Sequence, residues 1–323
     1  MSNILITGAS GFIGSRLCEI LLQNNNNVKA VTRNKLLSGN FIESENFSNI
    51  VIKDINGSTQ WEEQLANIDC VIHLAARVHI MNDLSDDPIK KYRDLNTLST
   101  INLARQAVKA GVKRFIYLST IKVNGEYTLV NTPFKASDHA NPSDPYALSK
   151  LEAEKSLLAL SSKEKIEVVI IRPPLVYGPG VKANFLSMMS WVNRGVPLPL
   201  GLIQNKRSLV ALDNLVNLIE VCILHKEAAN EVFLVSDDED LSISELLSKI
   251  AKALDKPNRL LPIPLILIKL IFNVLGKKDL SRRLLGSLQV DINKTKNILN
   301  WKPIVSIDQA LKNTTDFFLE SKN

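Results

Sequence analysis

The sequence of 323 residues contains few cysteines, few aromatic residues and no long run of basic residues. Its three cysteines, Cys18, Cys70 and Cys222, are widely spaced and odd in number, so we expect no disulfide framework and favour a reducing cytosol. They show no metal-ligand spacing, and we expect no metal site. Aromatic residues make up only 6% and are not interleaved with the dispersed basic residues, which disfavours nucleic acid. The net charge of +6 is better explained by an anionic small molecule.

The sequence also lacks an apolar run of the roughly 20 residues that span a bilayer. The stretch Leu260–Leu275 is strongly apolar but contains two prolines, a lysine and an asparagine. Four basic residues follow it, namely Lys277, Lys278, Arg282 and Arg283. Such a segment is compatible with an anionic membrane surface, but we favour a buried helix and expect no peripheral membrane contact. We expect no signal peptide, because an apparent strand begins at Asn3 and leads directly into a glycine-rich loop.

Hydrophobic and charged residues make up 45% and 22% of the chain, as in a globular protein of one large or two closely joined domains. The first half alternates short apolar runs with helical patterns, which predicts an α/β fold with a doubly wound parallel sheet. Strands are expected at Ile4–Thr7, Val28–Thr32, Ile50–Lys53, Cys70–Leu74, Arg114–Ser119 and Val168–Arg172. Helices are expected at Phe12–Leu22, Tyr92–Ala110 and Pro145–Ser161.

The alternating pattern stops after Arg172, where prolines and glycines crowd the chain. Val232–Val235 is predicted to be a late strand that returns to the sheet, and Ser242–Leu254 a helix that begins with a capping box. We therefore predict a parallel-sheet domain over 1–172 with a return strand near 206–235. The segments 173–205 and 236–323 are predicted to form a smaller, interleaved C-terminal domain, with the ligand cleft between the two.

The segment Gly8-Ala9-Ser10-Gly11-Phe12-Ile13-Gly14 lies between the first expected strand and the first expected helix. Glycines let the backbone turn tightly and approach a pyrophosphate, which then faces the N-terminus of the helix. An ordinary glycine turn is the alternative. The position of the loop favours dinucleotide binding by Gly8, Ser10, Gly11, Phe12, Ile13 and Gly14.

The second expected strand ends in Thr32-Arg33, where many NAD-binding folds carry an acidic residue that holds the ribose hydroxyls. With a guanidinium there and no carboxylate, a 2′-phosphate is favoured, so we predict NADP(H), with NAD(H) as the alternative. A solvated loop residue is the other interpretation of Arg33. Asp54, followed by Ile55, is either an acceptor for the adenine amino group or a turn residue.

The segment Ser143–Lys150 is predicted to begin a helix, with Asp144 as its cap and Pro145 in its first turn. Tyr146 and Lys150 are four residues apart and therefore share one helix face. We expect the ammonium to lower the pKa of the phenol towards the range of proton exchange at neutral pH. Such pairs also occur on solvated helix faces, so the weight of this one depends on its neighbours.

A second hydroxyl stands at the end of the strand expected at Arg114–Ser119. Thr120 at that point can donate a hydrogen bond to the same carbonyl oxygen that Tyr146 would protonate. Serine and threonine also end strands for purely structural reasons. Hydroxyl, tyrosine and lysine together make a carbonyl-reducing site, so we predict Thr120, Tyr146 and Lys150 as the catalytic residues.

Taken jointly, these motifs resemble the extended short-chain dehydrogenase/reductase superfamily and, within it, the nucleotide-sugar epimerases, dehydratases and reductases. The resemblance covers essentially the whole chain and rests on the glycine loop, Asp54, His73-Leu74-Ala75-Ala76, Ser119-Thr120, Tyr146 to Lys150, and Arg172-Pro173-Pro174-Leu175-Val176-Tyr177-Gly178-Pro179-Gly180. It implies a Rossmann-type domain, a bound nicotinamide cofactor and a C-terminal domain that grips a nucleoside diphosphate sugar. It further implies cofactor contacts by Leu74, Ala75, Ala76, Asn96, Tyr146, Lys150 and Pro173.

Three further segments resemble bacterial enzymes that act at C4 of UDP-N-acetylhexosamines in surface-polysaccharide synthesis. They are His73–His79, Gly180–Phe185 and Asn205–Val210. The resemblance implies that Asn184 and Arg207 contact the diphosphate and uridine of the substrate. A guanidinium suits a phosphate, although a rim residue paired with Asp213 is the alternative for Arg207. His73 and His79 invite a catalytic interpretation, but His73 lies inside a strand and is expected to be a packed residue.

We therefore predict an NAD(P)-dependent oxidoreductase that acts at C4 of a UDP-sugar. The sequence is also compatible with a homodimer. The Thr32-Arg33 strand end favours reduction of a UDP-2-acetamido-2,6-dideoxy-4-hexulose to UDP-N-acetylquinovosamine with NADPH, because an epimerase recycles tightly held NAD. A UDP-glucose or UDP-N-acetylglucosamine 4-epimerase shares every catalytic residue and is the alternative. A non-catalytic NADP-binding regulator is a third interpretation, against which the intact Thr120, Tyr146 and Lys150 argue.

Overall fold

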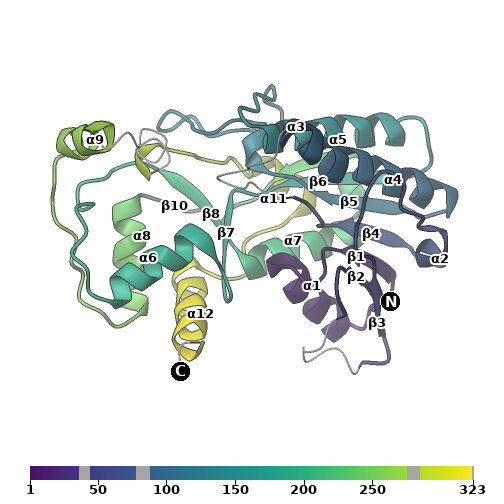
Figure 1. The fold of residues 1–323 in the computed structure, drawn as a ribbon, viewed down its shortest axis with the longest axis horizontal. Helices are drawn as coiled ribbons and strands as arrows, with labels where there is room; N and C mark the ends of the chain where they lie inside the picture. The colour runs from purple at the N-terminus through teal and green to yellow at the C-terminus, as the bar shows by residue number, and fades with distance from the viewer. Residues whose placement is uncertain (36–43, 78–87, 275–283, 322–323) are drawn as a thin grey trace.

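The computed structural model describes residues 1–35, 44–77, 88–274 and 284–321. A seven-stranded parallel sheet has the order β3-β2-β1-β4-β5-β6-β9 (Figure 1). Its strands are β1 (Asn3–Thr7), β2 (Asn27–Thr32), β3 (Phe47–Val51), β4 (Cys70–His73), β5 (Arg114–Leu118), β6 (Glu167–Arg172) and β9 (Glu231–Leu234). The order of the first six is that of the Rossmann fold, so the predicted α/β fold with a doubly wound sheet is confirmed.

Helices cover both faces of this sheet. They are α1 (Phe12–Gln23) and α7 (Leu212–Leu224) on one face and α4 (Ser99–Lys109) and α5 (Pro145–Ser161) on the other. Ile4 belongs to the core cluster that contains Leu17 of α1, whereas its neighbour Leu5 belongs to the cluster that contains Leu157 of α5. Successive side chains of one strand are thus buried on opposite faces, as the continuous apolar runs of the sequence predict.

A second, smaller sheet has its own core. It has the strand order β10-β8-β7 and consists of β7 (Leu175–Tyr177), β8 (Arg207–Ala211) and β10 (Asp240–Leu241), accompanied by α6 (Ala183–Asn193), α8 (Ile243–Ala253) and α12 (Ile307–Glu320). Phe185, Leu247 and Leu311 from these three helices share one core cluster. Figure 1 shows this group at the end of the molecule away from β3. The boundaries 1–172, 173–205 and 236–323 stay a prediction.

The remaining described helices are short. They are α2 (Glu62–Leu65), α3 (Pro88–Tyr92), the π-helix η1 (Arg93–Leu98), the 3₁₀ helices η2 (Ile121–Val123) and η3 (Lys226–Ala228), α9 (Leu265–Val274) and α11 (Asn293–Leu299). The helix predicted over 92–110 therefore consists of η1 followed directly by α4.

Predicted boundaries agree closely for most elements, and those of α5 agree at both ends. The strand Glu231–Leu234 pairs with β6, which confirms a strand that returns to the sheet. The predicted capping box of α8 is also present, because Ser242 and Glu245 each bond the backbone N–H of the other. The strand predicted at Ile50–Lys53 is wrong by two to three residues: β3 lies at Phe47–Val51, where it aligns with the single neighbour, β2, that supplies its hydrogen bonds.

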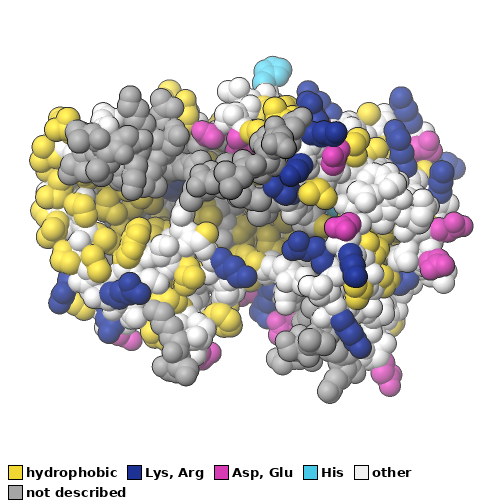
Figure 2. Space-filling model, in the orientation of Figure 1, with side chains coloured by type: hydrophobic (Ala, Val, Ile, Leu, Met, Phe, Trp, Pro, Cys, Tyr) yellow, Lys and Arg dark blue, Asp and Glu magenta, His cyan; other side chains and the backbone are white. Residues whose placement is uncertain are grey.

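The apolar helix α9 is not buried as predicted. Ile266, Leu267 and Leu270 are 79%, 49% and 58% exposed, whereas Ile268 is buried. Figure 2 shows hydrophobic side chains gathered at the end of the molecule where α9 lies. The basic residues predicted to follow, Lys277, Lys278, Arg282 and Arg283, lie outside the described residues. Within the described part of the chain, no helix is both long and apolar enough to cross a membrane.

Candidate active site

Segments that are far apart in the sequence meet where the strands of the large sheet end. The chain order reverses between β1 and β4, and ligands of doubly wound sheets bind at such a point, outside the carboxyl ends of the strands. The glycine loop follows β1, Leu74 follows β4, Ser119-Thr120 follows β5 and Pro173 follows β6. Most of the predicted catalytic and cofactor residues therefore share one edge of the sheet.

The loop from Gly8 to Gly14 is packed too tightly for side chains at its outer glycines. Gly8 has a φ of +73°, and a Cβ atom there would lie 2.8 Å from the backbone nitrogen of Ala75. A Cβ atom on Gly14 would lie 2.3 Å from the carbonyl oxygen of Gly8. Gly11 donates its N–H to the same carbonyl at 2.9 Å and is the N-cap of α1. The loop thus fits a pyrophosphate, whose charge the first N–H groups of α1 would meet.

The end of β2 is followed by two exposed cations, Arg33 and Lys35. Thr32 is buried, and its hydroxyl donates to the Asn34 carbonyl at 2.7 Å while accepting a 2.8 Å hydrogen bond from Asn49 Nδ2. Arg33 is exposed, as is Asp54, and Ile55 is half-buried. Because the hydroxyl of Thr32 serves the strand end itself, Arg33 is the better placed of the two to reach a ribose phosphate, and this contact stays a prediction.

Hydrogen bonds to Thr7 and to Asn96 hold the residues that follow β4. The N–H groups of Leu74 and Ala75 donate to the carbonyl oxygen and the hydroxyl of Thr7, at 3.2 and 3.3 Å. Asn96 is buried and bonds both backbone groups of Arg77, accepting from its N–H at 2.8 Å and donating to its carbonyl at 3.1 Å. Asn96 therefore holds the segment that the cofactor is predicted to contact, and its own contact with the cofactor stays a prediction.

His73 is a packed residue, as predicted. It is fully buried, and its ring nitrogens lie 2.7 Å from the hydroxyl of Thr7 and 3.0 Å from that of Thr100. Burial, together with the charge of Lys150, lowers the pKa of His73 to about 3. The ring is consequently neutral at physiological pH. His79 lies outside the described residues.

The N-terminus of α5 begins as the sequence predicts. Asp144 is the N-cap, its carboxylate accepts the N–H of Ala147 at 2.7 Å, and Pro145 occupies the first turn. One turn further on, Lys150 is buried and donates from Nζ to the carbonyl oxygen of Leu118 at 2.8 Å. This hydrogen bond places the ammonium at the end of β5, next to the segment that carries the predicted hydroxyls.

The predicted effect of Lys150 on Tyr146 is wrong in this structure. Burial raises the pKa of the Tyr146 phenol, and the neighbouring Asp144 and Tyr92 raise it further. The Lys150 ammonium is directed at the Leu118 carbonyl, and burial lowers its own pKa to about 7, so it is a weaker cation than an exposed lysine. The phenol therefore holds its proton more tightly than that of a free tyrosine.

Thr120 sits in a short turn that is tied to two other segments. It is the N-cap of η2, and its hydroxyl accepts the N–H of Lys122 at 3.3 Å. The N–H of Ile121 donates to the carbonyl of Pro173 at 2.9 Å, which ties the turn to the end of β6. The ammonium of Lys122 donates to the carboxylate of Asp144 at 2.6 Å, which ties the turn to the beginning of α5.

Sequence reasoning missed three residues near the predicted catalytic group. The Tyr92 ring meets the Tyr146 ring edge-on with centroids 6.2 Å apart, and the guanidinium carbon of Arg77 lies 5.6 Å from the centroid of Tyr92. Lys122 is the third. One signal could have revealed it, because a cation two residues after Thr120 and an anion two residues before Tyr146 are suited to pair across the site.

The two predicted substrate residues differ in their surroundings. Arg207, the first residue of β8, is largely buried, donates to the carbonyl oxygen of Gly286 at 3.1 Å, and has its pKa lowered by burial. The alternative that it pairs with Asp213 is wrong, because that carboxylate binds the guanidinium of Arg16 at 2.8 Å. Asn184 is exposed in the first turn of α6. Their joint contact with a nucleotide stays a prediction.

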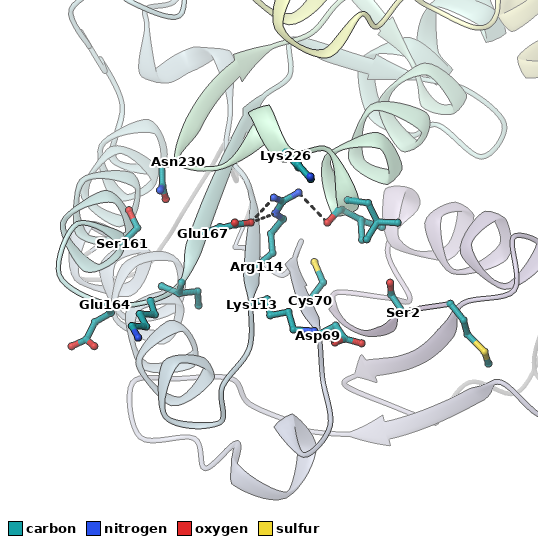
Figure 3. A pocket seen from close by; sticks show the side chains of 15 residues that line it. Ser2, Asp69, Cys70, Lys113, Arg114, Ser161, Glu164, Glu167, Lys226 and Asn230 are labelled. Carbon is teal, nitrogen blue, oxygen red and sulfur yellow. Dashed lines mark hydrogen bonds and ion pairs between the residues drawn. The ribbon is translucent and has the colours of Figure 1, made fainter.

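A cavity of about 720 Å³ opens at the opposite edge of the sheet, where β4, β5 and β6 begin (Figure 3). The Arg114 side chain projects into the cavity, but its guanidinium already has hydrogen-bond partners in the protein. Its guanidinium pairs with Glu167 and donates to the carbonyl oxygens of Cys222, Ile223 and His225. The cavity contains none of the predicted site residues, so it does not compete with the site at the carboxyl ends.

Comparisons with known proteins agree with this architecture. Residues 4–236 match the NAD dependent epimerase/dehydratase family. The chain is 50% identical over 323 residues to the UDP-glucose 4-epimerase of Vibrio cholerae, across 99% of this chain and 97% of that protein. It is 29% identical to the N-acetyl-alpha-D-glucosaminyl-diphospho-ditrans,octacis-undecaprenol 4-epimerase of Escherichia coli O157:H7, across 89% and 84% of the two chains.

Among solved structures, the UDP-glucuronic acid 4-epimerase of Bacillus cereus in complex with UDP-glucuronic acid and NAD is similar over 99% of both chains, with a TM-score of 0.79 and 23% identity. At that identity the likeness shows the fold alone, which is a Rossmann-type α/β fold. The chain belongs to the NAD dependent epimerase/dehydratase family. The predicted resemblance to nucleotide-sugar epimerases and dehydratases is thereby confirmed at the level of the family, whereas the quinovosamine-type reductase is not.

Proposed function

We propose that the protein is a UDP-sugar 4-epimerase that works with a tightly held NAD. The observation that carries this proposal is the 50% identity to the Vibrio cholerae UDP-glucose 4-epimerase along nearly the whole of both chains. Thr120, Tyr146 and Lys150 support it, because they gather where a doubly wound sheet binds its ligands. The substrate would be a UDP-hexose or UDP-N-acetylhexosamine, and its diphosphate would lie towards Arg207.

Different residues near the strand ends would transfer the proton and position the substrate and cofactor. Tyr146 would exchange a proton with the oxygen on C4 of the sugar, and Thr120 would donate a hydrogen bond to the same oxygen. Lys150 would hold the nicotinamide ribose beside them. The glycine loop and the segment Leu74–Ala76 would hold the cofactor, which would supply reversible hydride transfer at C4 of the sugar.

The environment of Tyr146 fits a reaction that depends on the loaded cofactor. Its raised pKa means that the phenol alone is a poor proton acceptor at neutral pH. An oxidised nicotinamide ring carries a positive charge, and an opposite charge nearby favours the phenolate. Proton removal by Tyr146 would thus be favoured only when the oxidised cofactor is in place.

A second candidate, a 4-keto-sugar reductase that consumes NADPH, is favoured by one observation. The end of β2 carries the exposed Arg33 and no acidic residue, which suits the 2′-phosphate of NADP(H). The two candidates therefore predict different cofactors as well as different net reactions.

One experiment separates them. The purified protein is analysed for bound nucleotide and then incubated with UDP-glucose, UDP-N-acetylglucosamine and a UDP-4-keto-6-deoxy sugar, with products followed by NMR and NADPH by absorbance. Copurified NAD and interconversion of C4 epimers without net cofactor loss would support the epimerase. Stoichiometric consumption of NADPH with the keto sugar, together with no epimerisation, would overturn it. The Arg33→Ala variant should then lose most of its preference for NADPH.

A further inference from the structure

An ion pair between Lys122 and Asp144 bridges the two segments that carry the predicted proton-transfer groups. Lys122 Nζ lies 2.6 Å from Asp144 Oδ2, and the two side chains are only 30% and 13% exposed. Each partner also makes a local hydrogen bond. The N–H of Lys122 donates to the hydroxyl of Thr120, and the carboxylate of Asp144 accepts the N–H of Ala147. One chain of contacts thus runs from the Thr120 hydroxyl to the first turn of α5.

We propose that Lys122 and Asp144 are positioning residues that join the turn carrying Thr120 to the beginning of α5 and set the charge beside the Tyr146 phenol. Asp144 is the N-cap of α5, whereas Lys122 takes no part in the cap. An uncharged cap such as asparagine would serve the helix equally well. A carboxylate at this position therefore has a second consequence, which is a negative charge two residues from the phenol.

The role of Lys122 follows from that charge. Asp144 is the second cause, after burial, of the raised pKa of Tyr146. The Lys122 ammonium lies against the carboxylate and offsets its charge, so it limits this effect. Removing the cation should make the phenol harder to ionise, whereas removing the anion should make it easier.

Among the described residues, other charged or titratable groups also lie near the phenol and stay unchanged in this test. They are Lys150 of α5, Tyr92 of α3 with Arg77 stacked on it, and Tyr117 of β5, together with Glu154, which acts on Lys150. The Lys122–Asp144 pair can be altered at both partners while the helix cap and the predicted catalytic residues are kept.

The inference builds on the proposed role of Tyr146, and its test does not require the sugar. Tyrosinate absorbance is titrated in the NAD-loaded protein, and the same titration of each variant in a Tyr146→Phe background is subtracted. We expect Lys122→Gln to raise the apparent pKa of Tyr146 and Asp144→Asn to lower it, each by about 0.5–1 pH unit, as expected for one charge several ångströms away. The double variant should titrate near the wild type.

Two further variants separate charge from shape. Lys122→Arg keeps the cation and should titrate like the wild type. Lys113→Gln removes a more exposed ion pair with Asp69 at the other edge of the sheet and should leave Tyr146 unchanged. Shifts of the same sign in Lys122→Gln and Asp144→Asn, or no shift in either, would overturn the proposal. Loss of NAD binding in Lys122→Arg would also overturn it, because shape would then decide.

The same variants test this proposal and the proposed function separately. If the protein epimerises UDP-sugars, the rising limb of kcat with pH should move up in Lys122→Gln and down in Asp144→Asn, while KM changes little. If no UDP-sugar is epimerised, the proposed function fails, but opposite shifts of the Tyr146 titration would still support the positioning pair.

Discussion

The Nζ atom of Lys150 donates a 2.8 Å hydrogen bond to the carbonyl oxygen of Leu118, the last residue of β5. This contact joins α5 to the strand whose end carries Thr120. Because an ammonium in a buried site requires hydrogen-bond partners, the carbonyl holds the lysine at a defined position beside the predicted site. The arrangement of the site thus depends on a backbone group that no side-chain motif reveals.

Tyr146→Phe is expected to abolish turnover while NAD binding and the fold are kept, because the phenol oxygen alone can exchange the proton. Loss of a positioned acid or base typically costs about 10²–10⁴ in rate. Single-turnover kinetics with a UDP-sugar and calorimetry with NAD measure the two properties. A variant that retained most of its turnover would remove Tyr146 from the mechanism.

Gly14→Ala is expected to abolish NAD binding, since its Cβ atom would lie 2.3 Å from the carbonyl oxygen of Gly8 and deform the loop. Gly111→Ala is the control. Unlike Gly14, Gly111 has a positive φ, of +76°, and a Cβ atom there meets nothing within 4 Å. It should lose only about 1–2 kcal/mol of stability and bind NAD normally. Equal loss of NAD binding in both variants would show that general destabilisation is responsible.

Arg207→Ala is expected to weaken UDP binding more than NAD binding, by about 2–5 kcal/mol if the guanidinium meets the substrate diphosphate. Arg259→Ala is the control, because this exposed arginine of the C-terminal part donates to the carbonyl of Gly195. Calorimetry with UDP alone makes the comparison. Unchanged affinity for UDP in Arg207→Ala would assign that residue a structural role at Gly286.

The buried pair of Glu154 and Arg172 should matter more for stability than the exposed pair of Glu152 and Arg93. The first pair has side chains that are 2% and 8% exposed, and the second 29% and 50%. Glu154→Gln should cost about 3–5 kcal/mol because a buried guanidinium loses its counter-charge. Glu152→Gln should cost less than about 1 kcal/mol. Denaturant unfolding compares them, and similar losses would contradict the difference in burial.

The buried His73 should make the protein less stable in acid. Its folded pKa of about 3 lies below the ordinary value of 6.5, so between these two values the unfolded chain binds a proton that the folded chain does not. Stability should fall as pH drops from about 6.5 towards 3, with a slope from this residue of up to about 1.4 kcal/mol per pH unit.

The variant His73→Gln should flatten that part of the curve, whatever its effect on stability at neutral pH. His139→Gln, at an exposed position, should leave the slope unchanged. The measurement is the free energy of unfolding at several pH values. An unaltered slope in His73→Gln would mean that the histidine is protonated in the folded protein.

The helix and strand pattern, the glycine loop and the beginning of α5 follow from local sequence. Apolar runs of strand length are buried wherever the strand lies, and Asp144 caps a helix whatever its other neighbours are. The strand order could be anticipated from the family resemblance, but the offset of β3 could not. An edge strand takes its limits from its one neighbour, and the pairing of Phe47 with Val28 is a long-range contact.

The sequence by itself determined which residues stand at the strand ends and which classes of chemistry they can perform. Only the tertiary structure decided their electrostatics, because burial and distant partners set a pKa. The spacing of Tyr146 and Lys150 predicted an acidified phenol, whereas burial and Asp144 raise its pKa and the ammonium turns to Leu118. The ion pair between Lys122 and Asp144 likewise exists because two segments 22 residues apart meet at one edge of the sheet.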